Sequence, residues 1–201
     1  MTPKIEFVYS STYDSALLYL QKMKWNDGYG EAVLSYIKGI EKDWRKTEKK
    51  VLKEMSIATG FKWRRKKIEC FVVNHSICFS RPLTMKIRGK HEKVLPKSLF
   101  IDILTHELIH NLFEMNDIWK LNVWKGFENE SRQVRAHIYV HALHKRLYLK
   151  FFGEERLIAD IKKASMLDKI RPGYSRAWEI VEQYGHENLL RRLREAVKKK
   201  K

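Results

Sequence analysis

Residues 99–113, LFIDILTHELIHNLF, are the stretch that decides how this chain is built. Apolar side chains occupy nearly every side of a helical projection of this stretch, which is typical of a buried helix. Within it His106, Glu107 and His110 spell HELIH. Ionisable side chains in a buried helix need partners, and a bound metal ion supplies one. We therefore expect a helix over residues 98–115 that carries a metal site.

The spacing of the HELIH residues suits a zinc ion. Residues four apart lie one turn apart on the same helix face, so His106 and His110 project their imidazoles side by side. Tetrahedral zinc requires two of its ligands in this arrangement. Glu107 lies about 100° round the helix, where its carboxylate reaches a metal-bound water without ligating the metal. The alternative is a chance pattern that forms a solvent-facing polar patch on an ordinary amphipathic helix.

A third ligand is expected on the following helix, at about residues 127–151. Glu130 lies there, 20 residues beyond His110. HELIH together with Asn129-Glu130 resembles the gluzincin branch of the zincin metallopeptidases, in which HExxH is followed by a ligand glutamate on the next helix. The resemblance implies zinc held by the two histidines and Glu130, with Glu107 as the general base.

Histidines on the same helix offer an alternative to this ligand set. A helical projection places six residues on one face: Glu130, Val134, His137, His141, His144 and Tyr148. This face is either a polar stripe or the wall of a cleft. In a cleft, His137 would orient a ligand or stabilise an oxyanion, as would His141, Tyr139 or Tyr148. A rival version makes His137 the third ligand in place of Glu130.

One departure from the thermolysin-like pattern concerns the support of the zinc histidines. That pattern has an acidic residue four positions after the ligand glutamate, and here the position is Val134. Ligating histidines usually donate their second N–H to a carboxylate or a carbonyl. Asp102, one turn before His106, and Glu114, one turn after His110, lie on the right helix face, and a backbone carbonyl is equally suitable.

Together with the segments on either side of the motif helix, the sequence predicts an α+β fold that is predominantly helical. Residues 5–9, 67–73 and 77–87 are rich in β-branched and aromatic side chains and predict strands, the last two joined as a hairpin by a turn at 74–76. Pro82 makes the last segment an edge strand or an interrupted strand. The resemblance implies that this small sheet packs on the motif helix and that a peptide lies along residues 77–87.

The remaining helical patterns and the length suggest the organisation of the chain. Helices are expected at about residues 10–24, 30–59, 154–167, 174–184 and 186–198. The 201 residues fit one compact domain. Within it we expect an N-terminal helical region over 1–60, a zincin-like catalytic core over 61–153, and a C-terminal helical extension with a basic tail over 154–201.

The composition of the chain indicates which binding partners and which cellular compartment to expect. With 41 basic and 24 acidic residues the formal charge is +17, which favours acidic partners, nucleic acid above all. The alternative is a lysine-rich surface without such a partner. Cys70 and Cys78 are too few for a disulfide framework and predict reduced thiols. Neither a signal peptide nor a sufficiently long apolar stretch is visible, so we expect a cytoplasmic protein without a membrane partner.

The sequence thus predicts a zinc-dependent metallopeptidase that hydrolyses peptide bonds of a peptide or protein substrate. Zinc would lower the pKa of its bound water to about 7 and polarise the scissile carbonyl, while Glu107 would take the proton and return it to the leaving amine. The alternative is a basic nucleic-acid-binding protein with a structural or inactive zincin-like site. A protease that acts near DNA, as the SprT-like family does, combines the two, but that family expects its third ligand histidine sooner than His137.

Overall fold

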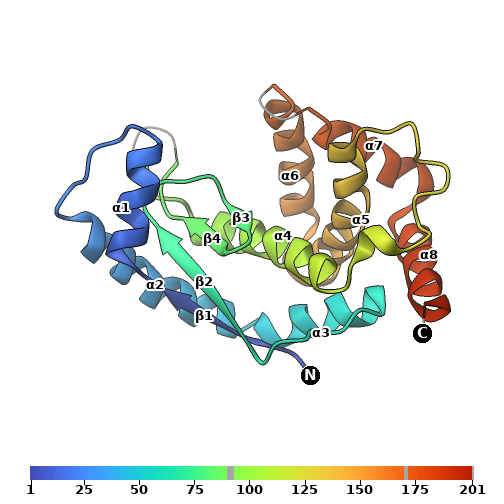
Figure 1. Ribbon diagram of the computed structural model, residues 1–201, viewed down its shortest axis with the longest axis horizontal. Coiled ribbons are helices and arrows are strands. Elements are labelled where there is room, and N and C mark those ends of the chain that lie inside the picture. Colours follow the sequence, from blue (N-terminus) through green and yellow to red (C-terminus); the bar gives the residue numbers. More distant parts are fainter. Residues whose placement is uncertain (90–92, 170–171, 201) are drawn as a thin grey trace. The chain divides into compact units, whose positions relative to one another are not determined.

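The computed structural model describes residues 1–89, 93–169 and 172–200 (Figure 1). Within these ranges the chain is mostly helical and has one four-stranded mixed sheet. The expected α+β, predominantly helical class is therefore confirmed.

The chain divides into two compact units, each built from two separate stretches of sequence. The first unit comprises Met1–Lys50 and Trp63–Asn111, and the second comprises Val51–Lys62 and Leu112–Lys201. The regions expected over residues 1–60, 61–153 and 154–201 stay a prediction.

The sheet belongs to the first unit. Its longest strand, β2 (Lys67–Val73), pairs in parallel with β1 (Lys4–Val8) on one side and with β4 (Leu83–Lys86) on the other. The short strand β3 (Phe79–Ser80) pairs antiparallel with β4, which gives the order β1-β2-β4-β3. The segment after β2 therefore contributes an edge strand.

The predicted hairpin between residues 67–73 and 77–87 was wrong, because β2 and β4 run parallel. Directly after β2, Asn74 donates from its backbone N–H at 3.0 Å and from its side-chain Nδ2 at 2.7 Å to the carboxylate of Asp14. These bonds hold the chain where the turn was expected. The reversal falls instead at Pro82, between β3 and β4, because proline lacks the N–H that a continuous ladder needs.

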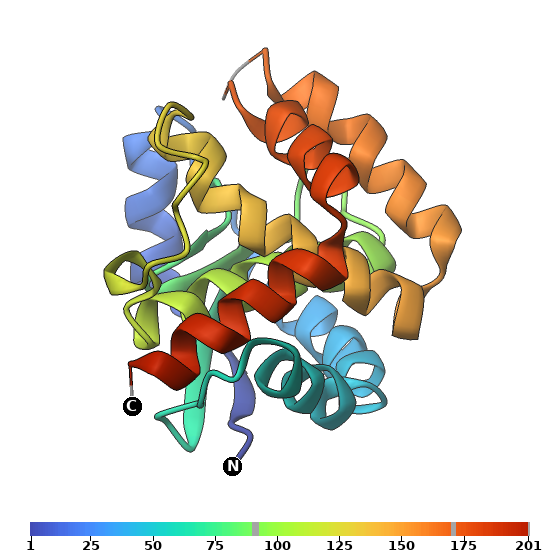
Figure 2. The same cartoon turned by 90° about the vertical axis from the view of Figure 1, so that its right-hand side faces the viewer.

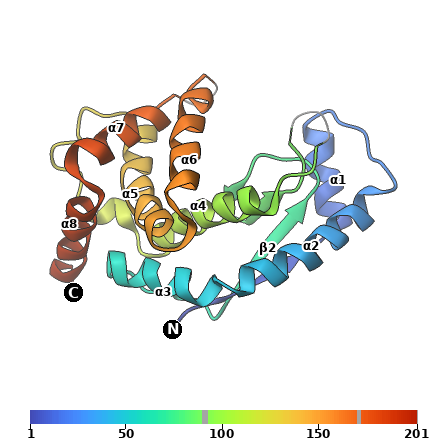
Figure 3. The same cartoon turned by 180° about the vertical axis from the view of Figure 1, so that it is seen from behind.

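Two helices of the first unit precede β2 in the chain. They are α1 (Ser11–Leu20) and α2 (Tyr29–Arg45). The side chain of Ser10 accepts a hydrogen bond from the backbone N–H of Tyr13 and so caps α1. Helix α2 contacts both β1 and β2 (Figure 3), so it covers part of the sheet.

The single helix predicted over residues 30–59 is in fact two helices. Helix α2 ends at Arg45, and α3 (Glu48–Thr59) follows it. The backbone N–H of Thr47 donates to the carbonyl of Trp44 at 2.9 Å, which tightens the chain into a turn. A carboxylate oxygen of Glu48 then accepts the backbone N–H of Ile5 at 2.7 Å, so the start of α3 is tied to β1.

The motif helix, α4 (Lys97–Met115), has the predicted bounds to within a residue. Its apolar residues are buried, among them Phe100, Leu104, Leu108, Ile109 and Leu112. The expectation of a buried motif helix is confirmed. Because the first unit ends at Asn111, the whole HELIH segment belongs to that unit.

The regular secondary structure in the described residues of the second unit is helical. Helices α7 (Tyr174–Tyr184) and α8 (His186–Lys199) pack against α5 (Arg132–Leu147), and α6 (Glu154–Leu167) packs against α7 (Figure 2). The last three helices confirm the predicted bounds almost to the residue. Gly185, with φ of 76°, separates α7 from α8 in a backbone conformation that favours glycine.

Helix α5 begins later than predicted. Its first residue is Arg132 rather than Phe127, because the side chain of Ser131 accepts the backbone N–H of Val134 at 3.2 Å and caps the helix. Residues 116–131 form a connection that contains one short 3-10 turn, Ile118–Lys120. Glu130 therefore lies before the helix and not on its face.

Candidate metal centre

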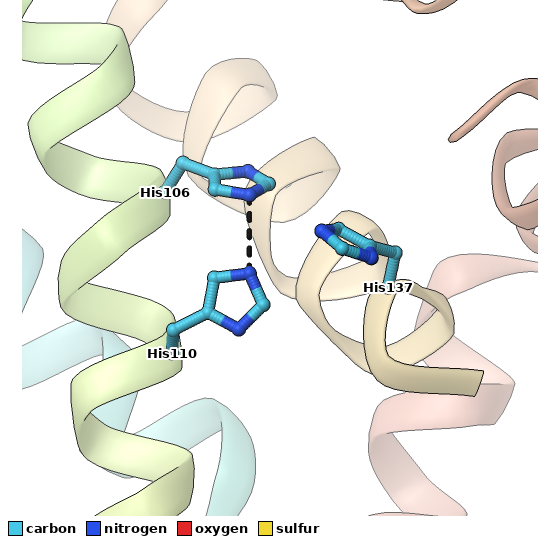
Figure 4. Close-up of side chains that lie close together, drawn as sticks. All are labelled: His106, His110 and His137. Carbon is cyan, nitrogen blue, oxygen red and sulfur yellow. Dashed lines mark hydrogen bonds between the residues drawn. The ribbon is translucent and has the colours of Figure 1, made fainter. Parts of the chain in front are cut away.

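The motif histidines face each other on α4. The Nε2 atoms of His106 and His110 are 3.2 Å apart (Figure 4), and both side chains are partly exposed. Two nitrogens that ligate one tetrahedral zinc at about 2.0–2.1 Å are themselves about 3.3 Å apart. The separation of this pair thus fits two ligands of one zinc ion.

Glu107 projects from a different side of α4. Burial, followed by the nearby Cys78 and Glu107, raises the pKa of the Cys70 thiol well above its usual range. The helix repeat places Glu107 about 100° round α4 from His106. Cys70 and Cys78 are both free thiols.

His137 completes a group of three imidazoles. One ligand atom from each of His106, His110 and His137 lies within 4.8 Å of the others (Figure 4). His137 is buried on α5, and its Nδ1 is 2.9 Å from the backbone carbonyl of Gln133. A carbonyl accepts hydrogen bonds only, so Nδ1 carries a proton, and the neutral ring presents the lone pair of Nε2 to a ligand.

Glu130 is not part of this group. One of its carboxylate oxygens accepts hydrogen bonds from Arg176, at 3.0 Å from Nε and 2.7 Å from Nη2. This contact also raises the pKa of the Arg176 guanidinium. Of the two third ligands considered from the sequence, the structure brings His137 to the histidine pair and engages Glu130 in an ion pair.

Other residues singled out in the sequence have identifiable positions. Asp102 is buried and Glu114 is partly exposed, both on α4; neither belongs to the three-imidazole group, and their role in orienting a ligand stays a prediction. The hydroxyl of Tyr139 donates to the carbonyl of Val123 at 2.9 Å, so this group is already engaged. His144 and Tyr148 are buried, with ring centroids 4.4 Å apart. The predicted polar stripe on α5 is therefore mostly buried.

Two aromatic residues of α7 lie against the histidines of α5, and the sequence did not reveal them. The ring of Tyr174 lies 4.3 Å from that of His137, and Trp178 stacks on His141 at 4.4 Å and 14°. Both are on a helix some forty residues further along the chain. Their spacing of four residues is the only signal, and it matches the spacing of the two histidines.

The position of Tyr174 is fixed by a capping carboxylate. Asp168 accepts the backbone N–H groups of Gly173, Tyr174 and Ser175, the shortest bond being 2.7 Å to Tyr174. Burial acts to raise the pKa of Asp168, but the hydrogen bonds from Ser175 and its neighbours outweigh it and hold the pKa below its usual value. The first turn of α7 is thereby held in place beside His137.

Comparisons with protein-family models, with curated proteins and with solved structures gave no match. Among the described residues, no helix combines the length and the apolar character that crossing a membrane requires.

Proposed function

We propose that this chain is a zinc-dependent metallopeptidase that hydrolyses peptide bonds, with zinc bound by His106, His110 and His137. The observation that carries the proposal is the group of three imidazoles around HELIH. Zinc with three protein ligands keeps a fourth position for water and supplies a Lewis acid that polarises a carbonyl. Imidazole nitrogens are among the donors that zinc prefers.

Glu107 is the proposed general base. It directly follows a ligand histidine, and its carboxylate oxygen would accept the proton of the attacking water and return it to the leaving amine. Removal of such a group typically costs about 10²–10⁴-fold in rate.

The substrate is proposed to lie along the edge of the sheet. Strand β3 is at that edge, and the side-chain amide of Asn111 donates to the carbonyl of Ser80 at 2.9 Å. Asn111 directly follows His110, so this hydrogen bond ties the motif helix to the edge strand. An extended peptide could add to such an edge through main-chain hydrogen bonds.

The zincin-like fold and the gluzincin-like ligand set are separable parts of the proposal. A glutamate ligand is the feature that defines the gluzincin pattern, and the ion pair of Glu130 with Arg176 favours a ligand set of three histidines instead. We therefore propose a zincin-like peptidase with His137 as the third ligand, and Glu130 as a ligand stays an alternative prediction.

The decisive experiment combines metal content with peptide cleavage. Glu107→Gln should retain stoichiometric zinc and lose cleavage of a fluorogenic peptide library, whereas Glu155→Gln, the same substitution at an exposed position of α6, should retain both. Full cleavage by Glu107→Gln would refute the role of Glu107. A folded wild-type protein that takes up no zinc from buffer would refute the site itself.

The third ligand is tested by cobalt substitution, whose visible absorption reports the donor atoms independently of activity. His137→Ala should change the intensity of the cobalt spectrum and weaken metal binding, while Glu130→Gln should leave both unchanged. The reverse outcome would restore Glu130 and with it the gluzincin-like ligand set.

A further inference from the structure

The connection between α4 and α5 presents a stacked aromatic pair at the surface of the second unit. Trp119 and Trp124 lie 4.7 Å apart with 20° between their ring planes, and 41% of Trp119 is exposed. The guanidinium of Arg132 lies 5.9 Å from the centre of the Trp119 ring. An exposed indole backed by a second indole is a rigid, flat platform.

The platform rests on buried contacts that hold it in place. Trp124 meets the ring of Tyr139 edge-on at 5.5 Å, and the Tyr139 hydroxyl donates to the carbonyl of Val123. Because Tyr139 is fully buried on α5, the connection is anchored at this point. The exposed part of the Trp119 side chain is thus held at the surface of the second unit.

The platform continues into a basic face of α8. Arg192 donates a hydrogen bond to the carbonyl of Lys125 and lies over the ring of Phe127 at 5.3 Å. Tyr184, 43% exposed, meets the same Phe127 ring edge-on at 5.3 Å. A pocket beside it is lined by Tyr184, Asn188, Leu189, Arg191, Arg192 and Glu195. Tyr184 and Arg192 therefore contact the same connection, residues 116–131, that carries Trp119 and Trp124.

The acidic and basic side chains of this surface differ in how many of them have a local partner. Asp117 pairs with Lys120, and Glu128 accepts the backbone N–H of Gly126, so these carboxylates are occupied locally. In the described part of the chain, no acidic side chain lies within ion-pair distance of Lys125 or Arg191. Lys125 and Arg192 both help to lower the pKa of Glu128, so they have one acidic neighbour. Arg191 and the +17 of the chain favour an external anion.

We propose that this surface, defined by Trp119, Lys125, Arg132, Tyr184, Arg191 and Arg192, binds single-stranded nucleic acid. Exposed aromatic rings stack on bases that are not already stacked in a duplex, and cations between them follow the phosphates. Duplex DNA offers the phosphates but not the free base faces, and an acidic peptide offers charge without aromatic planes. The proposal concerns residues of the second unit only and does not depend on zinc.

Binding is tested with the full-length chain and fluorescein-labelled oligothymidylate, followed by anisotropy. Trp119→Ala should weaken binding about tenfold, the loss expected for one stacked base. Tyr19→Ala removes another exposed aromatic side chain, 82% exposed on α1, and should change the Kd less than about twofold. If Trp119→Ala binds like the wild type, the platform is refuted.

The electrostatic part is tested by the salt dependence of the same binding. Arg191→Gln should lower the slope of log Kd against log salt concentration by about 0.7, the value for one phosphate contact to a single strand. Lys162→Gln makes the same charge change on α6 and should leave the slope unchanged. An equal effect of both variants would mean attraction by net charge alone and would overturn the proposal.

Competition identifies the ligand class. Unlabelled oligothymidylate should displace the probe at lower concentration than duplex DNA of the same length or polyglutamate. Equal displacement by the duplex or by polyglutamate would refute a surface specific for single strands. The zinc-ligand variant His106→Ala/His110→Ala should bind the probe normally, which separates this result from the fate of the proposed peptidase.

Discussion

Two histidine pairs of this chain have the same spacing and different surroundings. His106 and His110 on α4 are partly exposed, and their Nε2 atoms lie 3.2 Å apart. His137 and His141 on α5 are buried, with ring centroids 5.4 Å apart, and aromatic rings of α7 lie against both. A spacing of four residues brings two imidazoles to one helix face, but what covers the rings decides which nitrogens can meet a ligand.

The pair on α5 is therefore expected to supply one ligand rather than two. The Nδ1 of His137 donates a hydrogen bond to the carbonyl of Gln133, so Nε2 is the ring nitrogen that can ligate a metal ion. The ring of His141 is stacked on Trp178 and is not among the three imidazoles that lie together. The comparison predicts that the two pairs differ in zinc binding and in their contribution to stability.

The largest expected effect is the loss of zinc from the α4 pair. His106→Ala/His110→Ala should reduce stoichiometric zinc to background after dialysis, with an unchanged far-UV circular dichroism spectrum. His141→Phe retains an aromatic ring against Trp178 but has no ring nitrogen, so it should keep its zinc. Loss of zinc from His141→Phe, or retention of zinc by the double variant, would contradict the proposed difference in zinc binding between the two pairs.

The sequence could predict the α4 pair because its geometry is local. HELIH lies within one continuous helix, so the relative positions of its side chains follow from the helix repeat alone. The three C-terminal helices were predictable for the same reason, since their glycine breaks and apolar spacing are local signals. The charge and the two free cysteines needed only counting.

The third ligand was harder to predict because it depends on where α5 begins. Spacing favoured Glu130, but the Ser131 cap starts the helix at Arg132 and leaves Glu130 to pair with Arg176. The aromatic cover from α7 and the parallel pairing of β2 with β4 are contacts between distant segments, and no local pattern encodes them. The hairpin prediction was wrong for this reason, the aromatic cover was not predicted, and Glu130 as a ligand stays a prediction.

The second prediction concerns stability of the covered pair. Trp178 is 3% exposed and stacks on His141, so Trp178→Ala should lower the free energy of unfolding by about 3–5 kcal/mol, as large-to-small core substitutions do. In metal-free protein, His106→Ala should cost less than about 1 kcal/mol, because its side chain is partly exposed. Urea denaturation measures both.

Trp25→Ala is the matched control for this experiment, because Trp25 is 41% exposed. Its loss should cost much less than that of Trp178. If Trp178→Ala and Trp25→Ala lower the free energy of unfolding by similar amounts, the packing of Trp178 on His141 does not stabilise the protein more than an exposed tryptophan does.

A smaller effect on zinc binding is expected at Tyr174, which packs against a proposed zinc ligand, His137. Its ring lies against His137 and limits the orientations of that imidazole. Tyr174→Ala should weaken zinc binding about tenfold, the lower end of the range for residues that orient a ligand. Tyr174→Phe keeps the ring and should bind zinc like the wild type. A defect in Tyr174→Phe equal to that in Tyr174→Ala would assign the effect to the hydroxyl instead of the packing.

The smallest predicted effect depends on pH and lies at the cap of α7. Asp168 has a pKa below its unfolded value of about 3.9, so it binds fewer protons in the folded state. Its contribution to stability is then complete above that value and is lost as the pH falls through the folded pKa. Asp168→Asn should cost about 1 kcal/mol at neutral pH, as loss of a cap does, and the difference from the wild type should shrink below about pH 4.

Asp27→Asn, the same substitution at an exposed turn residue, separates the cap from a general effect of removing a negative charge. Urea denaturation across this pH range should show no comparable pH-dependent difference for Asp27→Asn. If the Asp168→Asn difference stays constant down to pH 3, the carboxylate does not stabilise α7 through its charge. The position of Tyr174 beside His137 would then depend on packing against α5 alone, and zinc binding should be insensitive to Asp168→Asn.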